Sequence, residues 1–433
     1  MSRYSRSIIF FILLFTLSII KFTLAVDFIL QGVIRETFDD NINSIVETPF
    51  EKKKYDFITE AVVGLGIRHE GKTDTLDIVG HVFQQVYAKN FKEKNKFKNN
   101  FQDITLDYTK AFSEVVSFHV IDVFQNYPEP DRFEALFGNA QGRMRYWRNN
   151  FNFLGTIEIT SLYTISLQYL NQFSKYFYTR PMSSYLSNFY SGISVDQKVN
   201  MSLMQIAQIR NELHWDAANN SFIFYEYQWS KPYPGKLLQV HRPGVGYRHD
   251  FTRQLFIEGR VAIDIVLPSY YVRYRVNAYN QQIIKSPRTY QTLFANLILS
   301  NNVDKKTNAS LSFTYQNSIL ANTLDAATNW QILGDVIRHI FPRVLLTSSV
   351  FYGEGYIYAT NATNRLFGIN LSLAYELTEH ISAAVYYNFI LNYTHVTGNY
   401  ITAGYVWNNR VGYAKEDTGY YRNRASLIFS AEF

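Results

Sequence analysis

The chain lacks cysteine altogether and carries little charge for its length. Because none of its 433 residues is cysteine, it has no disulfide bond and no thiolate-ligated zinc or iron–sulfur site. Charged residues make up 18% of the chain, below the roughly 25% typical of soluble domains. Beyond residue 25 there is no apolar run as long as the roughly 18 residues that indicate a membrane-spanning helix, so none is predicted there.

Aromatic residues, in contrast, are abundant. The chain contains 34 Tyr, 34 Phe and 5 Trp, or 17% of all residues. Disordered chains are poor in aromatic residues, so this composition argues against disorder. A single globular core does not require so many rings either. We therefore expect them on an extended apolar surface.

Residues 1–25 have the features of a secretory signal peptide. Arg3 and Arg6 precede an apolar stretch over 8–20, and Thr23-Leu24-Ala25 is a plausible cleavage site. The apolar stretch is shorter than the roughly 20 residues that span a bilayer, which favours removal near Ala25 over anchoring. Removal would lower the net charge from +6 to +3, because Arg3, Arg6 and Lys21 are the only charged residues in this segment. So small a charge gives no reason to expect a nucleic-acid partner.

The body of the chain alternates apolar and polar residues over long segments. One example is the stretch from Thr59 to Ile67, and another is the final segment from Ala425 to Phe433. Segments of this length match the roughly 9–11 residues that cross a bilayer as a tilted strand, whereas soluble strands cluster near 5–6. Many of the alternating positions are polar, which disfavours a soluble core. Rings near the strand ends, such as Phe151, Phe222 and Phe224, suggest the aromatic girdles of a membrane barrel.

Short and long connections alternate between these segments, as in up-and-down membrane barrels. Short turns are predicted at 70–72, 111–113, 195–198, 249–252, 303–306, 341–342 and 378–380. Longer links are predicted at 37–55, 89–99, 127–146, 268–289, 320–328, 358–364 and 395–419. This pattern predicts an all-β, transmembrane, antiparallel up-and-down β-barrel of about 18 strands, with 16 as the alternative. Segment 220–230 could be a further strand, an outer hairpin or a loop inside the lumen.

Two parts of the sequence resemble known outer-membrane barrels. The apolar-facing Phe429 and the terminal Phe433 resemble the C-terminal insertion signal of bacterial outer-membrane proteins. The stretches Val33–Ile42, Asp56–Ile58 and Val63–Gly66 resemble the opening of the beta-barrel porin type 2 family, and Pro128–Asn149 resembles one of that family's loops. The resemblance covers most of residues 26–433. It implies an outer-membrane location in a Gram-negative bacterium, with lipid and the barrel-assembly machinery as partners.

Several charged residues are candidates for contact with solutes. Arg143, Arg145 and Arg148 are interleaved with aromatic residues, and guanidinium groups entering a lumen would favour anions or sugar acids. They could equally bind lipid headgroups or loop carboxylates. Two further sets are considered for the same role: Arg260 with Asp264, four residues apart, and Arg273 with Arg275. Asp39 and Asp40 could bind a cation, although a solvated turn is the simpler interpretation.

These features predict an outer-membrane porin-like channel for small hydrophilic solutes, with a possible preference for anions or sugars. A non-conducting barrel acting in adhesion, envelope assembly or polysaccharide export is the main alternative. An enzyme such as a barrel hydrolase is disfavoured, because the scattered histidines form no recognisable catalytic or metal-binding motif. No cofactor or metal is predicted. The solute and the oligomeric state stay open.

Overall fold

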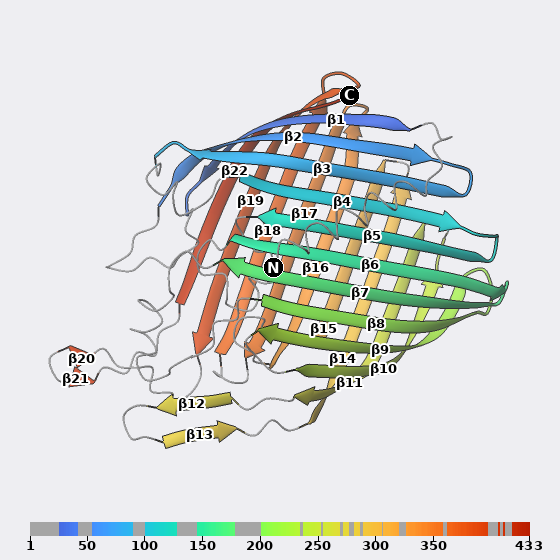
Figure 1. Ribbon diagram of the computed structural model, residues 1–433, viewed down its shortest axis with the longest axis vertical. Helices are drawn as coiled ribbons and strands as arrows, with labels where there is room; N and C mark the ends of the chain where they lie inside the picture. Colours follow the sequence, from blue (N-terminus) through green and yellow to red (C-terminus); the bar gives the residue numbers. More distant parts are fainter. Residues whose placement is uncertain are drawn as a thin grey trace, which may run out of the picture.

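The structure is a computed structural model. It describes residues 26–41, 54–89, 100–127, 145–177, 201–233, 237–252, 254–268, 272–276, 281–285, 289–304, 306–319, 326–357, 362–396, 406–407, 410–411 and 418–433. These residues form strands and connecting turns (Figure 1). They contain no helix long and apolar enough to cross a membrane.

The strands of the first half of the chain are β1 (Asp27–Asp39), β2 (Asp56–Glu70), β3 (Asp74–Tyr87), β4 (Asn100–Ala111), β5 (Val116–Tyr127), β6 (Arg145–Thr160), β7 (Tyr163–Phe177), β8 (Met201–His214), β9 (Asn219–Tyr233), β10 (Leu238–Asp250) and β11 (Leu255–Pro268). Those of the second half are β14 (Tyr290–Asp304), β15 (Thr307–Ile319), β16 (Ala326–Phe341), β17 (Val344–Ile357), β18 (Ala362–Glu376), β19 (Ile381–Val396) and β22 (Thr418–Glu432). Two short hairpins, β12 (Val272–Val276) with β13 (Gln281–Lys285) and β20 (Val406–Trp407) with β21 (Arg410–Val411), form separate small sheets.

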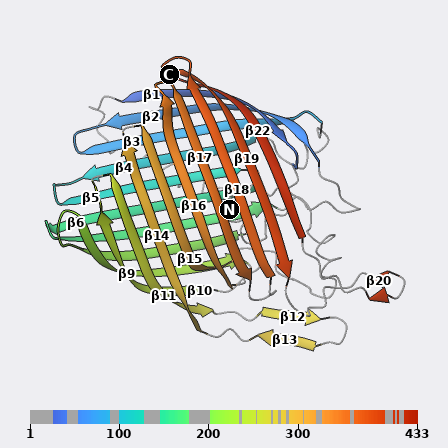
Figure 2. The same ribbon diagram turned by 180° about the vertical axis from the view of Figure 1, so that it is seen from behind.

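The long strands form one closed antiparallel sheet of 18 strands, which confirms the predicted barrel and strand number. Each strand pairs with its neighbour in the chain, apart from the two short hairpins, and β22 pairs with β1 to close the ring. Figures 1 and 2 show β1–β9 on one side of the barrel and β14–β22 on the other, crossing at a steep angle. Such a crossing is expected because the strands of a barrel tilt against its axis.

Connections at one end of the barrel are short. Examples are residues 71–73, 161–162, 215–218 and 342–343, and the described chain ends meet at this same end through Leu30 and Phe433. In the 215–218 turn, Asp216 accepts hydrogen bonds from the Asn219 side chain and from the Ala218 amide, which lower the pKa of Asp216. Most links at the other end are longer, such as those between β1 and β2 and between β7 and β8. The turns at 161–162 and 215–218 were not predicted from the sequence, and the predicted turn at 195–198 lies outside the described residues.

Segment 220–230 is a wall strand. It belongs to β9, which pairs with β8 over its whole length and with β10 over most of it. This register turns Phe222 and Phe224 toward the inside, where they are 3% and 5% exposed. Assigning these two rings to an interface girdle was therefore wrong. Other rings do lie on the outside near the long links, such as Phe38 packed on Phe57 with centroids 5.3 Å apart.

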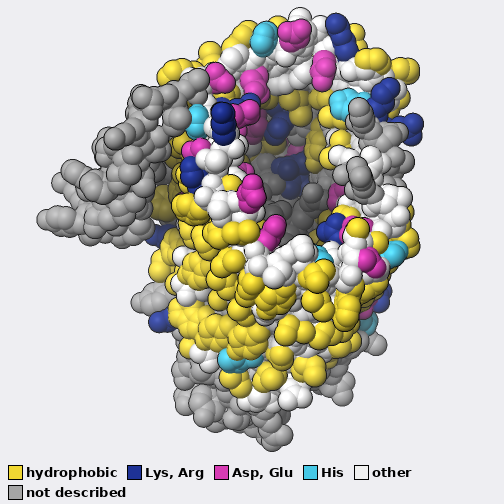
Figure 3. Space-filling view, turned by 90° about the vertical axis from the view of Figure 1, so that its right-hand side faces the viewer, with side chains coloured by type: hydrophobic (Ala, Val, Ile, Leu, Met, Phe, Trp, Pro, Cys, Tyr) yellow, Lys and Arg dark blue, Asp and Glu magenta, His cyan; other side chains and the backbone are white. Residues whose placement is uncertain are grey.

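The outer surface is apolar. Side chains alternate between the two faces of a strand, and residues paired across antiparallel strands share a face. On that basis each residue can be assigned to the inner or outer face by following the paired residues from strand to strand. The assignment made for β22 in this way matches that of β1, with which β22 pairs. Outer positions include Leu65, Val245 and Val385, which are 66%, 52% and 58% exposed. Figure 3 shows apolar side chains over the outside and charged ones around a hollow.

Candidate functional site: the inner wall of the barrel

Arg242 on β10 is the centre of a buried ion-pair group on the inner wall. Its Nε and Nη2 donate to the two oxygens of Asp264 on β11 at 2.6 and 3.1 Å. Its Nη1 donates to Glu226 on β9 at 2.6 Å. The side chain of Arg242 is only 7% exposed and that of Asp264 is 0% exposed. Asp264 also accepts from Asn317 at 3.2 Å, so both of its oxygens are occupied.

A second group lies nearer the short turns. Glu258 on β11 binds Arg210 on β8 at 3.3 Å and Arg260 on its own strand at 2.6 Å. Arg210 makes a further ion pair with Glu212 at 2.6 Å. These arginines are neutralised by carboxylates in their immediate surroundings. They act as cross-links within the β8–β11 wall rather than as free positive charges.

Aromatic rings lie beneath these guanidinium groups. The guanidinium carbon of Arg210 is 3.5 Å from the centre of the Phe222 ring, and that of Arg242 is 4.0 Å from the centre of the Phe294 ring. Phe222 is paired with Gly246 on β10, and a Cβ at Gly246 would stand 2.1 Å from the ring. The missing side chain therefore lets the ring lie flat on the wall, and the ring in turn supports Arg210 by a cation–π contact.

The β1–β5 part of the wall is acidic and rich in histidine. His81 on β3 binds Asp103 on β4 at 2.6 Å and Gln31 on β1 at 2.7 Å. The bond to Gln31 crosses β2 above Gly64, where a Cβ would be 2.6 Å from the histidine ring. Tyr127 on β5 donates to the second oxygen of Asp103 at 2.7 Å. A continuous polar chain thus runs across five strands.

A parallel row brings two carboxylates together. Asp77 on β3 and Asp107 on β4 are directly paired across the ladder on the inner face. Arg68 binds Asp77 at 3.0 Å from one side, and His119 binds Asp107 at 2.7 Å from the other. Like charges placed opposite each other are destabilising, so this pair depends on its flanking partners or on cations from the solvent.

A third ion-pair group lies at the closing seam, which is the pairing of β1 with β22. Asp39 on β1 is 0% exposed and binds Arg422 and Arg424 of β22, with Nε of each at 3.0 and 2.9 Å. Asp40 accepts from both the backbone and the side chain of Asn423 at 2.7 Å. These two aspartates therefore join the two ends of the sheet. The earlier interpretations of Asp39 as a solvated turn residue or a cation ligand do not fit this arrangement.

The predicted solute-contact residues are dispersed. Arg260 and Asp264 share the inner face but bind different partners, Glu258 and Arg242. Arg148 is on the inner face, 6% exposed, and donates to Ser174 at 3.4 Å. Arg145 begins β6, and its side chain lies outside the described part, as does the whole of Arg143. Arg273 and Arg275 belong to β12, apart from the barrel sheet, and only their backbone is described.

Sequence reasoning missed most of the ion-paired residues, including Arg210, Arg242 and Asp103. Arg242 stands between His241 and Pro243, and nothing in its local sequence marks it as the partner of a distant carboxylate. A better signal was available in β8 and β11, where arginine and glutamate recur two residues apart, as in Arg210 with Glu212. Such spacing puts both charges on one face of a strand.

Over the described inner wall, acidic side chains outnumber arginines. The arginines are Arg35, Arg68, Arg148, Arg210, Arg242, Arg248, Arg260, Arg422 and Arg424. The acids are Asp27, Asp39, Asp56, Glu60, Glu70, Asp77, Asp103, Asp107, Glu158, Glu212, Glu226, Asp250, Glu258, Asp264, Asp335, Glu376 and Glu432. Arg35, Arg68, Arg210, Arg242, Arg248, Arg260, Arg422 and Arg424 are each within ion-pair distance of a carboxylate. The excess charge of this surface is therefore negative.

Two further observations limit the site. Among the residues whose placement is described, no group of three or more histidine or acidic side chains could hold a metal ion.

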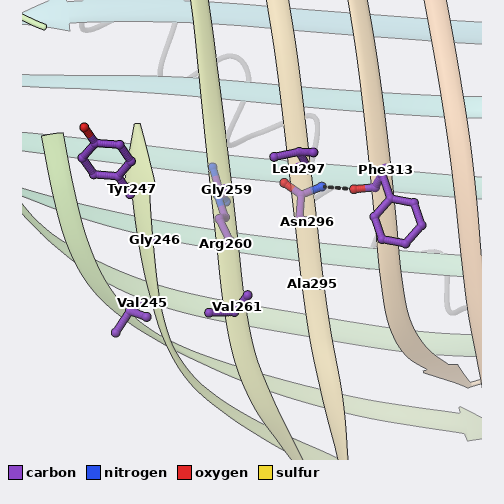
Figure 4. A pocket seen from close by; sticks show the side chains of 10 residues that line it. All are labelled: Val245, Gly246, Tyr247, Gly259, Arg260, Val261, Ala295, Asn296, Leu297 and Phe313. Atoms are coloured by element: carbon purple, nitrogen blue, oxygen red, sulfur yellow. Dashed lines mark hydrogen bonds between the residues drawn. The ribbon is translucent and has the colours of Figure 1, made fainter. Parts of the chain in front are cut away.

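A groove lined by Val245, Tyr247, Gly259, Val261 and Leu297 lies between β10, β11 and β14 (Figure 4). Its side chains are on the outer face, and Val261 is 51% exposed. This groove is outside the barrel and separate from the inner wall.

Comparisons with known proteins give only distant matches. The sequence matches no protein-family model and no curated protein. Among solved structures, OccAB4 of Acinetobacter baumannii matches with a TM-score of 0.45 and 9% identity over 95% of this chain and 99% of that one. OpdO of Pseudomonas aeruginosa matches at 0.42 and 9% over 94% and 97%. The siderophore receptor PirA of Acinetobacter baumannii matches at 0.45 and 11% over 95% and 81%. Similarity this low carries neither a substrate nor a residue role to this chain.

Proposed function

We propose that the protein is an outer-membrane channel of a Gram-negative bacterium through which small hydrophilic solutes diffuse. The observation that supports it best is the division between the two faces of one closed sheet. The outer face is apolar, with side chains such as Leu65 and Val385 exposed, whereas the inner face carries the ion pairs and polar chains described above. Barrels of 16–18 strands are wide enough to leave an aqueous channel.

We further propose that the channel prefers cations to anions. The sequence suggested anions or sugars, on the basis of Arg143, Arg145 and Arg148. The described arginines are largely neutralised, and the β1–β5 wall adds carboxylates such as Asp103 and Asp107 whose bonds run to histidine or tyrosine. A negative lining raises the local concentration of cations.

Planar-bilayer recording of the purified protein under a KCl gradient tests both statements. Stable single-channel steps with a reversal potential on the cation-selective side are expected. Asp107→Asn should reduce the preference for K⁺, because the side chain of Asp107 is 45% exposed. The matched control is Glu354→Gln, which neutralises a carboxylate on the outer wall and should leave selectivity unchanged. Inserted barrels that give no steps would favour a non-conducting protein, and anion selectivity would reject the proposed preference.

The proposal includes export and assembly. Residues 1–25 lie outside the described part, and we infer that they are removed near Ala25, which the mass of the protein isolated from membranes would establish. Phe429 and Phe433 are both outward-facing and are 48% and 63% exposed. An exposed terminal ring is suitable for contact with the barrel-assembly machinery. Replacement of Phe433 by alanine should therefore lower the yield of assembled barrel without changing conductance.

A further inference from the structure

Four polar side chains interrupt the apolar outer wall. Asp122 on β5, Asn149 on β6, Asn171 on β7 and Gln205 on β8 lie on four neighbouring strands, and we name them the outer polar patch. Asp122 is paired with Phe151, Phe151 with Asn171, and Asn171 with Gln205, so they share one face. That face is the outer one, because Leu167 and Ile209, at matching positions on β7 and β8, are 45% and 39% exposed.

Asp122, the charged member of the patch, lies within the apolar band rather than at a rim. Asp122 is near the middle of β5 (Val116–Tyr127). With about 3.3 Å per residue it is therefore roughly 17–20 Å along the strand from either end. Its outer-face neighbours are the side chains of Leu106, Phe124 and Phe151, all large and apolar. In a barrel whose lipid-facing band is about 25 Å tall, Asp122 faces hydrocarbon.

The internal hydrogen bonds of the patch satisfy only part of its polar atoms. Asn149 donates to one oxygen of Asp122 at 2.6 Å. The amide oxygen of Asn171 is buried beneath neighbouring side chains and has no hydrogen-bond partner among the described groups, so the acceptor of the patch that stays open to an outside partner is the second oxygen of Asp122. Lipid tails offer neither donors nor acceptors, and unsatisfied polar groups in hydrocarbon cost several kcal/mol each. On the opposite part of the outer wall, Val350, Leu371 and Val385 are exposed, and the charged pair of Arg365 and Glu354 lies three residues from the long-link ends of β18 and β17.

The chemistry of the patch points to a second copy of this chain. A carboxylate accepts hydrogen bonds, whereas the amides of Asn149, Asn171 and Gln205 both donate and accept. The patch is thus complementary to itself, which is what a two-fold contact requires. It contains no lysine or arginine, so an anionic lipid headgroup would meet Asp122 without a compensating cation. Four strands about 4.8 Å apart span roughly 15–20 Å, enough for one side of a modest interface.

We propose that the protein forms a dimer in the membrane in which the outer polar patch of one barrel packs against that of its partner. This inference rests on the proposed membrane placement and not on conduction. In this contact, amide groups of the second copy would replace the lipid around Asp122 and donate hydrogen bonds to its carboxylate. Phe151 and neighbouring rings would supply the apolar part of the interface.

Photo-crosslinking of the full chain in its native membrane tests the dimer. A benzophenone amino acid at position 205 should give a product of twice the barrel's mass, at least tenfold more than the same probe at position 371. Leu371 is 41% exposed on β18, across the barrel from the patch. Asp122→Leu combined with Asn149→Leu should lower the dimer product tenfold while the protein still migrates as a folded barrel on unheated gels.

Three results would overturn the proposal. These are lipid adducts alone at position 205, a crosslink to a different protein alone, or equal dimer yields at positions 205 and 371. Membrane fractionation of the same samples reports whether the chain is inserted, and bilayer recording reports conduction. A monomer that conducts would therefore reject the proposed dimer but not the proposed channel. A dimer that does not conduct would reject the proposed channel but not the dimer.

Discussion

Replacing Asp264 with alanine should destabilise the barrel far more than breaking an exposed ion pair of similar length. Asp264 is fully buried and holds two nitrogens of Arg242 at 2.6 and 3.1 Å. It also accepts a hydrogen bond from Asn317 at 3.2 Å. The substitution leaves these donors buried without their acceptor, although Glu226 continues to bind Arg242 at 2.6 Å.

The size of the effect follows from burial. Removing one partner of a buried ion pair costs about 3–5 kcal/mol, because the remaining charge cannot regain its hydration. Because Arg242 keeps its contact with Glu226, we expect Asp264→Ala to lower the free energy of unfolding by about 3 kcal/mol, at the lower end of this range. The matched control is Arg365→Ala. Arg365 binds Glu354 at 2.8 Å, but these side chains are 51% and 30% exposed. An exposed pair contributes about 0.2–1 kcal/mol.

Urea unfolding of both variants in lipid vesicles, followed by tryptophan fluorescence, measures the difference. A double-mutant cycle with Arg242→Ala isolates the coupling of the buried pair. We expect Asp264→Ala to lose at least about 2 kcal/mol more than Arg365→Ala. Equal losses in the two variants would refute the conclusion that burial makes this ion pair essential to the β8–β11 wall.

Two further predictions concern the wall and its seam. Gly246→Ala should cost about 1–3 kcal/mol in the same unfolding assay, because its Cβ would stand 2.1 Å from Phe222. Gly259→Ala is the control, since its Cβ would meet nothing closer than 3.7 Å, and equal losses would contradict the proposed close contact. Asp39→Ala should lower the temperature at which the folded band is lost on gels, because Arg422 at the seam loses its carboxylate. An unchanged transition would show that backbone pairing alone closes the barrel.

Much of the architecture can be predicted from the sequence, because side-chain alternation and turn-forming residues are local features of the chain. Side chains of a strand alternate between faces, so the final segment from Ala425 to Phe433 could be assigned an apolar face without any knowledge of its partners. Turn-forming residues likewise marked connections such as 70–72 and 378–380. Together these signals predicted an antiparallel barrel of about 18 strands, which the structure confirms. Where the local pattern was ambiguous, as in 220–230, the strand assignment stayed open, and the placement of Phe222 and Phe224 in an interface girdle failed.

The inner wall depends on pairings that no local pattern contains. Arg242 meets Asp264 22 residues away, and Asp39 meets Arg422 383 residues away. Whether two such side chains meet depends on the register of every pair of strands between them. Closure of the ring requires all of these registers to be compatible at the same time. Composition and alternation therefore sufficed for an apolar outside and a polar inside. Which charges neutralise one another, and which polar groups stay facing lipid, emerged only when the sheet closed and placed distant strands side by side.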